Sequence, residues 1–130
     1  DKGVSVTLDV GAASFHGDPG DLTEMLGNLL DNAFKWCRGQ VRVSARLTSR
    51  SEAVRPSLEI AVEDDGPGIA EDMKSRILQR GVRADQTTPG HGLGLAMVQD
   101  TVALYRGELV LESSTLGGLA VRLRFAEGRR

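Results

Sequence analysis

The sequence has only one cysteine, Cys37, so no disulfide can form within the chain. It has no apolar run long enough to cross a bilayer, and its first residues do not resemble a signal peptide. It also has little excess charge. Sixteen basic residues against eighteen acidic ones give a net charge of −2, which offers no reason to propose a nucleic-acid or membrane-surface partner. Because the chain begins at Asp1 without Met, we expect it to be a piece of a longer protein.

A length of 130 residues predicts one domain, spanning residues 1–130, with enough chain to form a core. We interpret the single cysteine as a small core residue. The sixteen glycines are many, and they gather in D-D-G-P-G, P-G-H-G-L-G-L and L-G-G. Glycine clusters indicate places where the backbone turns sharply or approaches a ligand closely.

The stretch from Leu22 to Cys37 predicts a long helix, because its apolar residues recur at three- and four-residue steps. Asp18 suits the N-cap of this helix and Pro19 its first position. We expect the helix to run to about Lys35 and to stop near Gly39.

The remaining elements are predicted from alternating or short apolar runs and from glycine breaks. Five strands are expected, over residues 4–10, 41–47, 58–62, 108–113 and 120–125. Two further helices are expected over residues 70–79 and 93–105, with residues 80–91 between them as a mobile lid. This order predicts an α+β fold, a two-layer α/β sandwich whose mixed, mostly antiparallel sheet is covered on one face by three helices.

A polar stripe on the long helix is the first candidate site. Asn28, Asn32 and Lys35 lie one turn apart, with Asp31 at the edge of the stripe. Amide oxygens can ligate a hard cation, and amide nitrogens and an ammonium group can donate to phosphate oxygens. The stripe therefore indicates a metal–phosphate face, although an ordinary solvated helix face explains it equally well.

Two glycine-rich segments are further candidates. Asp64, after a predicted buried strand, can accept a hydrogen bond from an exocyclic amine, while Gly66 and Gly68 let a flat ring approach; the alternative is an ordinary acidic turn. The segment G-H-G-L-G-L leads into a helix, whose first N–H groups bind phosphate well. Its spacing matches neither a dinucleotide fingerprint nor a P-loop.

These motifs together resemble a known family. N-L-L-D-N-A-F-K-W, E-D-D-G-P-G-I and G-H-G-L-G-L-A, in this order, are similar to the N, G1 and G2 boxes of the sensor histidine kinase ATP-binding domain. The resemblance covers essentially the whole chain. It implies the Bergerat fold of the superfamily that includes type II topoisomerase ATPase subunits and the MutL repair protein. R-G-V-R-A-D-Q-T-T-P-G-H-G and S-T-L-G-G further resemble the PhoQ-type sensor kinases.

The resemblance implies a role for each box, with ATP and Mg²⁺ as cofactors. Asn28 would ligate Mg²⁺, Asn32 and Lys35 would contact phosphates, and Asp64 would bind the adenine amino group. The implied nucleotide-binding set is Asn28, Asn32, Lys35, Trp36, Asp64, Gly66, Gly68, Ile69, Arg83, Gly90, Gly92, Leu93, Gly94 and Leu95.

Three positions depart from the family pattern. Trp36 stands where the family usually has Tyr, Phe or His, Leu78 where it usually has Phe, and His91 where the PhoQ type has a Gln able to reach Mg²⁺. Imidazole is a poorer ligand than an amide oxygen for a hard cation, so His91 is not counted as a ligand.

The function implied is that of the catalytic domain of a protein histidine kinase. It would bind Mg-ATP and deliver the γ-phosphoryl group to a histidine on a separate dimerisation and phosphoacceptor domain, for relay to a response regulator. No catalytic residue is assigned within the chain, and neither His16 nor His91 lies in a phosphoacceptor context. The fragment is expected to be monomeric, not inserted in a membrane, and to be a cytoplasmic portion of an inner-membrane sensor kinase.

Two alternatives remain open. An ATPase of the same superfamily would need a Glu to activate water where this chain has Asn28, and an amide cannot act as a general base. Glu24 lies one turn earlier, about 6 Å back along the helix, and is poorly placed to substitute. A degenerate nucleotide-binding module used only for docking is the other alternative.

Overall fold

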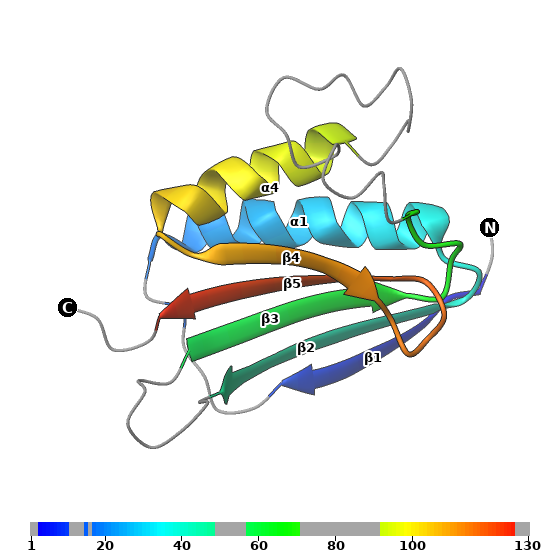
Figure 1. Cartoon of the computed structure of the whole chain (residues 1–130). Coiled ribbons are helices and arrows are strands. Elements are labelled where there is room, and N and C mark those ends of the chain that lie inside the picture. Colours follow the sequence, from blue (N-terminus) through cyan, green and yellow to red (C-terminus); the bar gives the residue numbers. More distant parts are fainter. Residues whose placement is uncertain (1–2, 11–14, 16, 49–56, 71–91, 127–130) are drawn as a thin grey trace.

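The computed structural model describes residues 3–10, 15, 17–48, 57–70 and 92–126 (Figure 1). The helices and strands, in chain order, are β1 (Ser5–Val10), α1 (Pro19–Trp36), β2 (Gln40–Thr48), β3 (Ser57–Asp64), α4 (Gly92–Leu104), β4 (Glu108–Ser113) and β5 (Leu119–Ala126). Neither described helix is long and apolar enough to cross a membrane.

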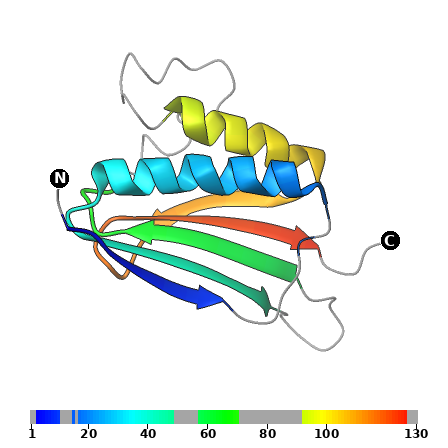
Figure 2. The same ribbon diagram turned by 180° about the vertical axis from the view of Figure 1, so that it is seen from behind.

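The strands form one sheet in the order β1-β2-β3-β5-β4. β1 pairs with β2 in parallel and the other neighbours are antiparallel, which confirms the predicted mixed, mostly antiparallel sheet. Figures 1 and 2 show α1 and α4 side by side over one face of this sheet. We call the opposite face the open face. The predicted two-layer class is therefore confirmed. Most of the predicted helix over residues 70–79 and the whole of the predicted lid lie outside the described residues.

The hydrophobic core lies between the two helices and the sheet. α1 contributes Met25, Leu29 and Ala33, as its periodicity predicts, and each is at most 3% exposed. α4 and the strands supply the facing residues Leu95, Val98, Val102, Val41, Val62, Val121 and Leu123. Cys37 is buried in the same cluster, which confirms its interpretation as a core residue.

The two ends of α1 differ from the expectation in detail. Asp18 occupies the N-cap position and Pro19 begins the helix, but the Asp18 side chain makes no capping hydrogen bond. Its backbone N–H donates instead to the hydroxyl of Tyr105, 3.0 Å away, and that hydroxyl donates to Asp21 at 2.6 Å. Tyr105, the residue after α4, therefore accepts a hydrogen bond from the backbone N–H at the start of α1 and links the two helices.

The third strand was predicted to end at residue 62, which is wrong, because the strand continues for two more residues. Glu63 and Asp64 belong to β3, opposite Arg42 and Val41 of β2. Acidic residues have low strand propensity, but an Arg directly across the ladder and continued backbone pairing override that preference.

A network of charged and hydroxyl groups, which we call the open-face network, holds β2, β3 and the β4–β5 turn together. Arg42 donates from Nε to Glu63 Oε2 at 3.1 Å and from Nη2 to Oε1 at 2.8 Å. Ser114 Oγ donates to the same Oε1 at 2.8 Å, and Arg42 Nη2 also reaches the Thr115 hydroxyl at 2.9 Å. The Glu63 side chain is 4% exposed, so these donors replace the water that it has lost.

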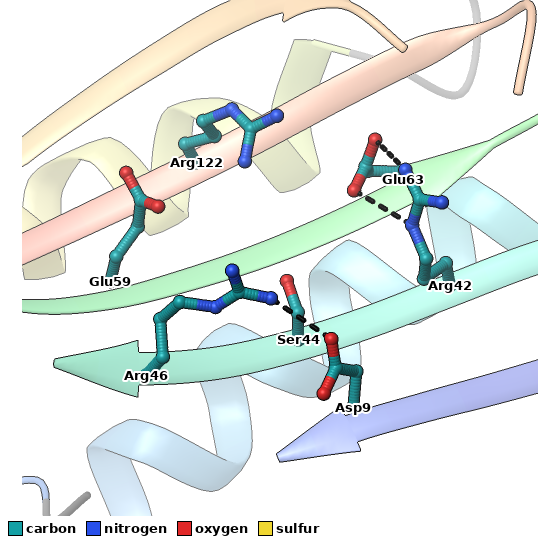
Figure 3. Close-up of a pocket in the computed structure, with 7 residues that line it drawn as sticks. All are labelled: Asp9, Arg42, Ser44, Arg46, Glu59, Glu63 and Arg122. Carbon is teal, nitrogen blue, oxygen red and sulfur yellow. Dashed lines mark hydrogen bonds and ion pairs between the residues drawn. The ribbon is translucent and has the colours of Figure 1, made fainter. Parts of the chain in front are cut away.

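The open-face network lies beside a polar pocket. Figure 3 shows this pocket, which is lined by Asp9, Arg42, Ser44, Arg46, Glu59, Glu63 and Arg122. Its charges are largely paired with each other, since Arg46 also contacts Asp9 at 2.9 Å. That second pair is exposed, with 54% and 65% of the side chains accessible, in contrast to the buried Glu63.

We expect Arg42→Ala to lower the free energy of unfolding by about 3–5 kcal/mol, because it leaves the buried Glu63 carboxylate without its cation. Arg46→Ala, on the same strand and face, is expected to change it by less than about 1 kcal/mol. Urea unfolding of both variants at neutral pH measures the difference, and equal values would contradict the assigned role of Arg42.

The Arg42→Ala penalty should also depend on pH. Burial acts to raise the pKa of the Glu63 carboxyl, but hydrogen bonds from Arg42 and Ser114 outweigh it and hold the pKa below its ordinary value. A lowered pKa stabilises the folded chain above the unfolded-state pKa, and this contribution is lost as the pH falls through the folded-state pKa. The penalty is therefore expected to shrink on acidification.

Candidate functional site

Four segments that are distant in the sequence meet at one end of the sheet. These are the end of α1, the end of β3, the start of α4 and the turn between β4 and β5, all at the right-hand side of Figure 1. Contacts join them in pairs. A Cβ added at Gly94 of α4 would lie 3.5 Å from Asn32 Nδ2 of α1, and Gly118 N of the turn donates to the Asp64 carbonyl at 3.1 Å. Gly66, after β3, also packs against the Trp36 carbonyl at the end of α1, so the described parts of the three predicted motifs are brought together.

Asp64, the last residue of β3, is a buried carboxyl group at this end, on the side of the sheet that the helices cover. It is 5% exposed, and its Oδ1 accepts hydrogen bonds from the N–H groups of Gly66 (2.8 Å) and Leu119 (3.3 Å). Burial raises the pKa of this carboxyl above its ordinary value, and the two backbone donors offset only part of that effect. Its Oδ2 takes part in none of the hydrogen bonds found among the described residues.

Two glycines make this environment possible. A Cβ on Gly66 would overlap the Trp36 carbonyl oxygen at the end of α1. A Cβ on Gly118 would overlap Asp64 Oδ1 and lie 2.5 Å from Gly66 N. Both positions are therefore restricted to glycine by close backbone packing, as the glycine clusters predicted in general terms.

The polar stripe on α1 lies partly under α4 and is not simply a solvated face. Asn28 and Asn32 are half-buried against Gly94, whereas Lys35 is exposed. The Asn32 Nδ2 atom is buried and has no hydrogen-bond partner in the described part of the chain. Buried amide donors are normally satisfied, so this one indicates a missing acceptor.

The donor set at this end fits Mg²⁺ held mainly by a ligand. Among the described residues, no group of three or more His, Cys, Asp or Glu side chains is placed to hold a metal ion. Mg²⁺ commonly uses one or two protein oxygens and completes its shell with phosphates and water. The amide oxygen of Asn28, beside Gly94 and Asn32, is suited to that role.

The remaining residues of the predicted nucleotide-binding set lie in different environments. Gly68 has φ +76°, a backbone conformation that favours glycine, and it lies against Gly118. Ile69 packs on the core and Leu95 is fully buried within it, so the Leu95 side chain anchors α4. Gly92 and Leu93 begin α4. Arg83, Gly90, Leu78 and His91 lie outside the described residues.

Some residues at this end were not identified from the sequence. The backbone of Gly118 and Leu119 contacts Asp64, and Asp65 binds the chain just after α1. The L-G-G cluster was a signal for the first contact, but nothing in the sequence placed that turn beside β3. Nothing in the E-D-D sequence indicates that Asp65 binds the chain just after α1.

Comparison with known proteins identifies relatives across nearly the whole chain. The family described as "Histidine kinase-, DNA gyrase B-, and HSP90-like ATPase" matches residues 17–129. The "Two-component sensor PhoQ" of Pseudomonas aeruginosa is 46% identical over 127 residues, which are 97% of this chain and 27% of that protein. The chain thus spans about a quarter of the length of the curated relatives it matches.

Solved structures of similar fold include sensor histidine kinases. The mycobacterial sensor histidine kinase MprB is 28% identical with a TM-score of 0.74, covering 95% of this chain and 81% of that one. The full-length protein ShkA, solved in complex with AMPPNP, is 30% identical with a TM-score of 0.68, covering 98% of this chain and 27% of that one.

We expect Gly118→Ala to destabilise the chain by about 1–3 kcal/mol, because its methyl group would overlap backbone and carboxylate atoms around Asp64. Gly27→Ala is the matched control. Nothing lies within 4 Å of a Cβ there, and alanine in a helix is favoured over glycine by about 0.5–1 kcal/mol. Thermal unfolding should therefore shift in opposite directions, and a neutral Gly118→Ala would show that the turn can move away from Asp64.

Proposed function

We propose that this chain, which belongs to the family of histidine kinase-, DNA gyrase B- and HSP90-like ATPases, binds Mg-ATP at the end of the sheet where α1, β3, α4 and the β4–β5 turn meet. Adenine would lie at Asp64 and the phosphates between α1 and the start of α4. The observation that carries the proposal is the buried Asp64 carboxylate, one of whose oxygens already accepts two backbone hydrogen bonds.

The geometry of Asp64 supports recognition of adenine rather than guanine. With Oδ1 occupied, Oδ2 is the oxygen that can accept a hydrogen bond from the amino group of adenine. Guanine presents a carbonyl at the equivalent ring position, so two acceptors would face each other in a buried site. Gly66 and Gly68 place no side chain next to Asp64, which would let a flat ring approach.

The start of α4 and the stripe on α1 support phosphate binding. The buried Asn32 Nδ2 would donate to a phosphate oxygen, and the exposed Lys35 ammonium would add charge. The N–H groups at the start of α4, from Gly92 to Gly94, favour an anion because of the helix dipole. Asn28 would ligate Mg²⁺, which supplies charge neutralisation to the phosphates when bound. The proposed nucleotide contacts also include Arg83, Gly90, Leu93 and Trp36. Ile69 and Leu95 would support them from the core side.

We further propose that the reaction is phosphoryl transfer to a histidine on another domain. The chain would act by positioning the triphosphate, since Asn28 stands where a water-activating carboxylate would be needed for hydrolysis. The names of the relatives as sensors and sensor histidine kinases support this choice. The acceptor would be the dimerisation domain of the parent protein, with a response regulator as the next partner and a cytoplasmic location for this portion.

Asp64→Asn is expected to weaken ATP binding about 10- to 100-fold in calorimetric titration with Mg²⁺. The amide oxygen must take the place of Oδ1 opposite the Gly66 and Leu119 N–H groups, which turns the amide NH₂ toward adenine and replaces an acceptor with a donor. Asp9→Asn, in an exposed ion pair on the open face, is the control and should bind as the parent chain does. Equal binding by the parent and Asp64→Asn would place adenine elsewhere.

The transfer step is tested with radiolabelled ATP and the separate dimerisation and phosphoacceptor domain of the full-length protein. We expect label on that domain, none on this chain alone, and slow phosphate release from this chain by itself. Rapid hydrolysis without an acceptor would favour an ATPase. Absence of ATP binding would favour a docking module.

A further inference from the structure

Asp65, the residue after the proposed adenine ligand, binds the connection between α1 and β2. Its Oδ1 accepts hydrogen bonds from three successive backbone N–H groups, those of Arg38 (2.7 Å), Gly39 (3.1 Å) and Gln40 (3.2 Å). Successive N–H groups that converge on one oxygen form a concave anion-binding arrangement. Here the anion is a side chain of the protein itself.

The backbone of Asp65 strengthens the same attachment. Its N–H donates to the Gln40 carbonyl at 3.2 Å, and its own carbonyl accepts from Arg38 Nη1 at 3.3 Å. Although desolvation acts to raise it, the backbone donors hold the pKa of the Asp65 carboxyl below its ordinary value. The carboxylate is therefore charged at neutral pH and bound by charge-assisted hydrogen bonds.

This attachment determines where α1 ends relative to β3. α1 stops at Trp36, two residues before the three N–H groups held by Asp65. On the other side of Asp65, Gly66 approaches the Trp36 carbonyl so closely that a Cβ does not fit between them. The last turn of α1 is thus held against the end of β3 by the Asp65 carboxylate and by backbone contact at Gly66.

We propose that Asp65 is a positioning residue for nucleotide binding, which fixes the Trp36 end of α1 beside Asp64 without contacting the nucleotide. The proposal rests on the proposed function, in which Asp64 and the last turn of α1 both contact ATP. Small displacements of positioned groups have large effects on a bound ligand, so loss of the attachment should weaken binding in chains that remain folded.

For the loss of the Asp65 charge, electrostatics alone predicts the opposite change in ATP affinity, which makes the test decisive. Removing a negative charge from the binding end of the chain should by charge alone strengthen the binding of an anionic nucleotide. Removing a positioning group should weaken it. A purely stabilising residue would lower the melting temperature and leave the affinity of the folded chain unchanged.

The experiment uses the 130-residue chain and its variants Asp65→Ala and Asp65→Asn, with Asp9→Ala as the control for loss of an exposed carboxylate. The dissociation constant for Mg-ATP is measured at a temperature where circular dichroism shows each variant to be folded. The fluorescence of Trp36, the only tryptophan, reports the position of the end of α1.

We expect Asp65→Ala to bind Mg-ATP at least about tenfold more weakly and to shift the Trp36 emission. Asp65→Asn should stay within about threefold of the parent chain, because its amide oxygen still accepts the three N–H groups. If Asp65→Ala does not fold, Asp65→Glu serves instead, since it keeps the charge but displaces the carboxylate by one methylene, and it should also weaken binding.

Two outcomes overturn the inference in distinguishable ways. Unchanged or tighter ATP binding by Asp65→Ala, or by Asp65→Glu if the alanine variant is unfolded, would refute it alone, provided that Asp64→Asn loses affinity as expected. No ATP binding by the parent chain, or equal binding by Asp64→Asn, would overturn both the positioning role and the proposed function.

Discussion

The burial of the Asp64 carboxylate is the constraint on which this end of the molecule depends. A buried carboxylate must recover hydrogen bonds that it loses to water, and here the backbone N–H groups of Gly66, two residues later, and of Leu119, at the start of β5, supply them. Backbone can come this close only where Cβ atoms are absent, which explains Gly66 and Gly118. The chemistry of one side chain therefore dictates the residue type at positions both adjacent to it and far away in the sequence.

Three consecutive acidic residues perform three different tasks because they lie where β3 ends. Alternation along the strand sends Glu63 to the open face and Asp64 to the helix side, while Asp65 has left the strand and reaches the chain after α1. The β4–β5 turn connects two of these tasks. Its Ser114 binds Glu63, and its Gly118 binds the Asp64 backbone. The open-face network and the candidate site thus share one turn.

Sequence patterns predicted the described helices and strands and the motifs because periodicity and glycine clusters are local signals. The Met25–Leu29–Ala33 face of α1 follows directly from its helical spacing, and the glycines that follow Asp64 single out that carboxylate. The continuation of β3 through Asp64 could not be predicted, since it depends on Arg42 across the ladder. The contacts of Leu119 and Asp65 were equally hidden, because register and turn placement decide them.

The parallel pairing of β1 with β2, and the placing of the site at the meeting point of four segments, have a consequence for how the chain folds. Asp64 and Leu119 are 55 residues apart, Asp65 and Arg38 are 27 apart, and β1 pairs Ser5 with Gln40 across the whole of α1. Closing chain segments of this length costs more conformational entropy than forming a local hairpin such as β4–β5. The candidate site is therefore expected to form together with the whole sheet, and no single hairpin of the chain can carry it alone.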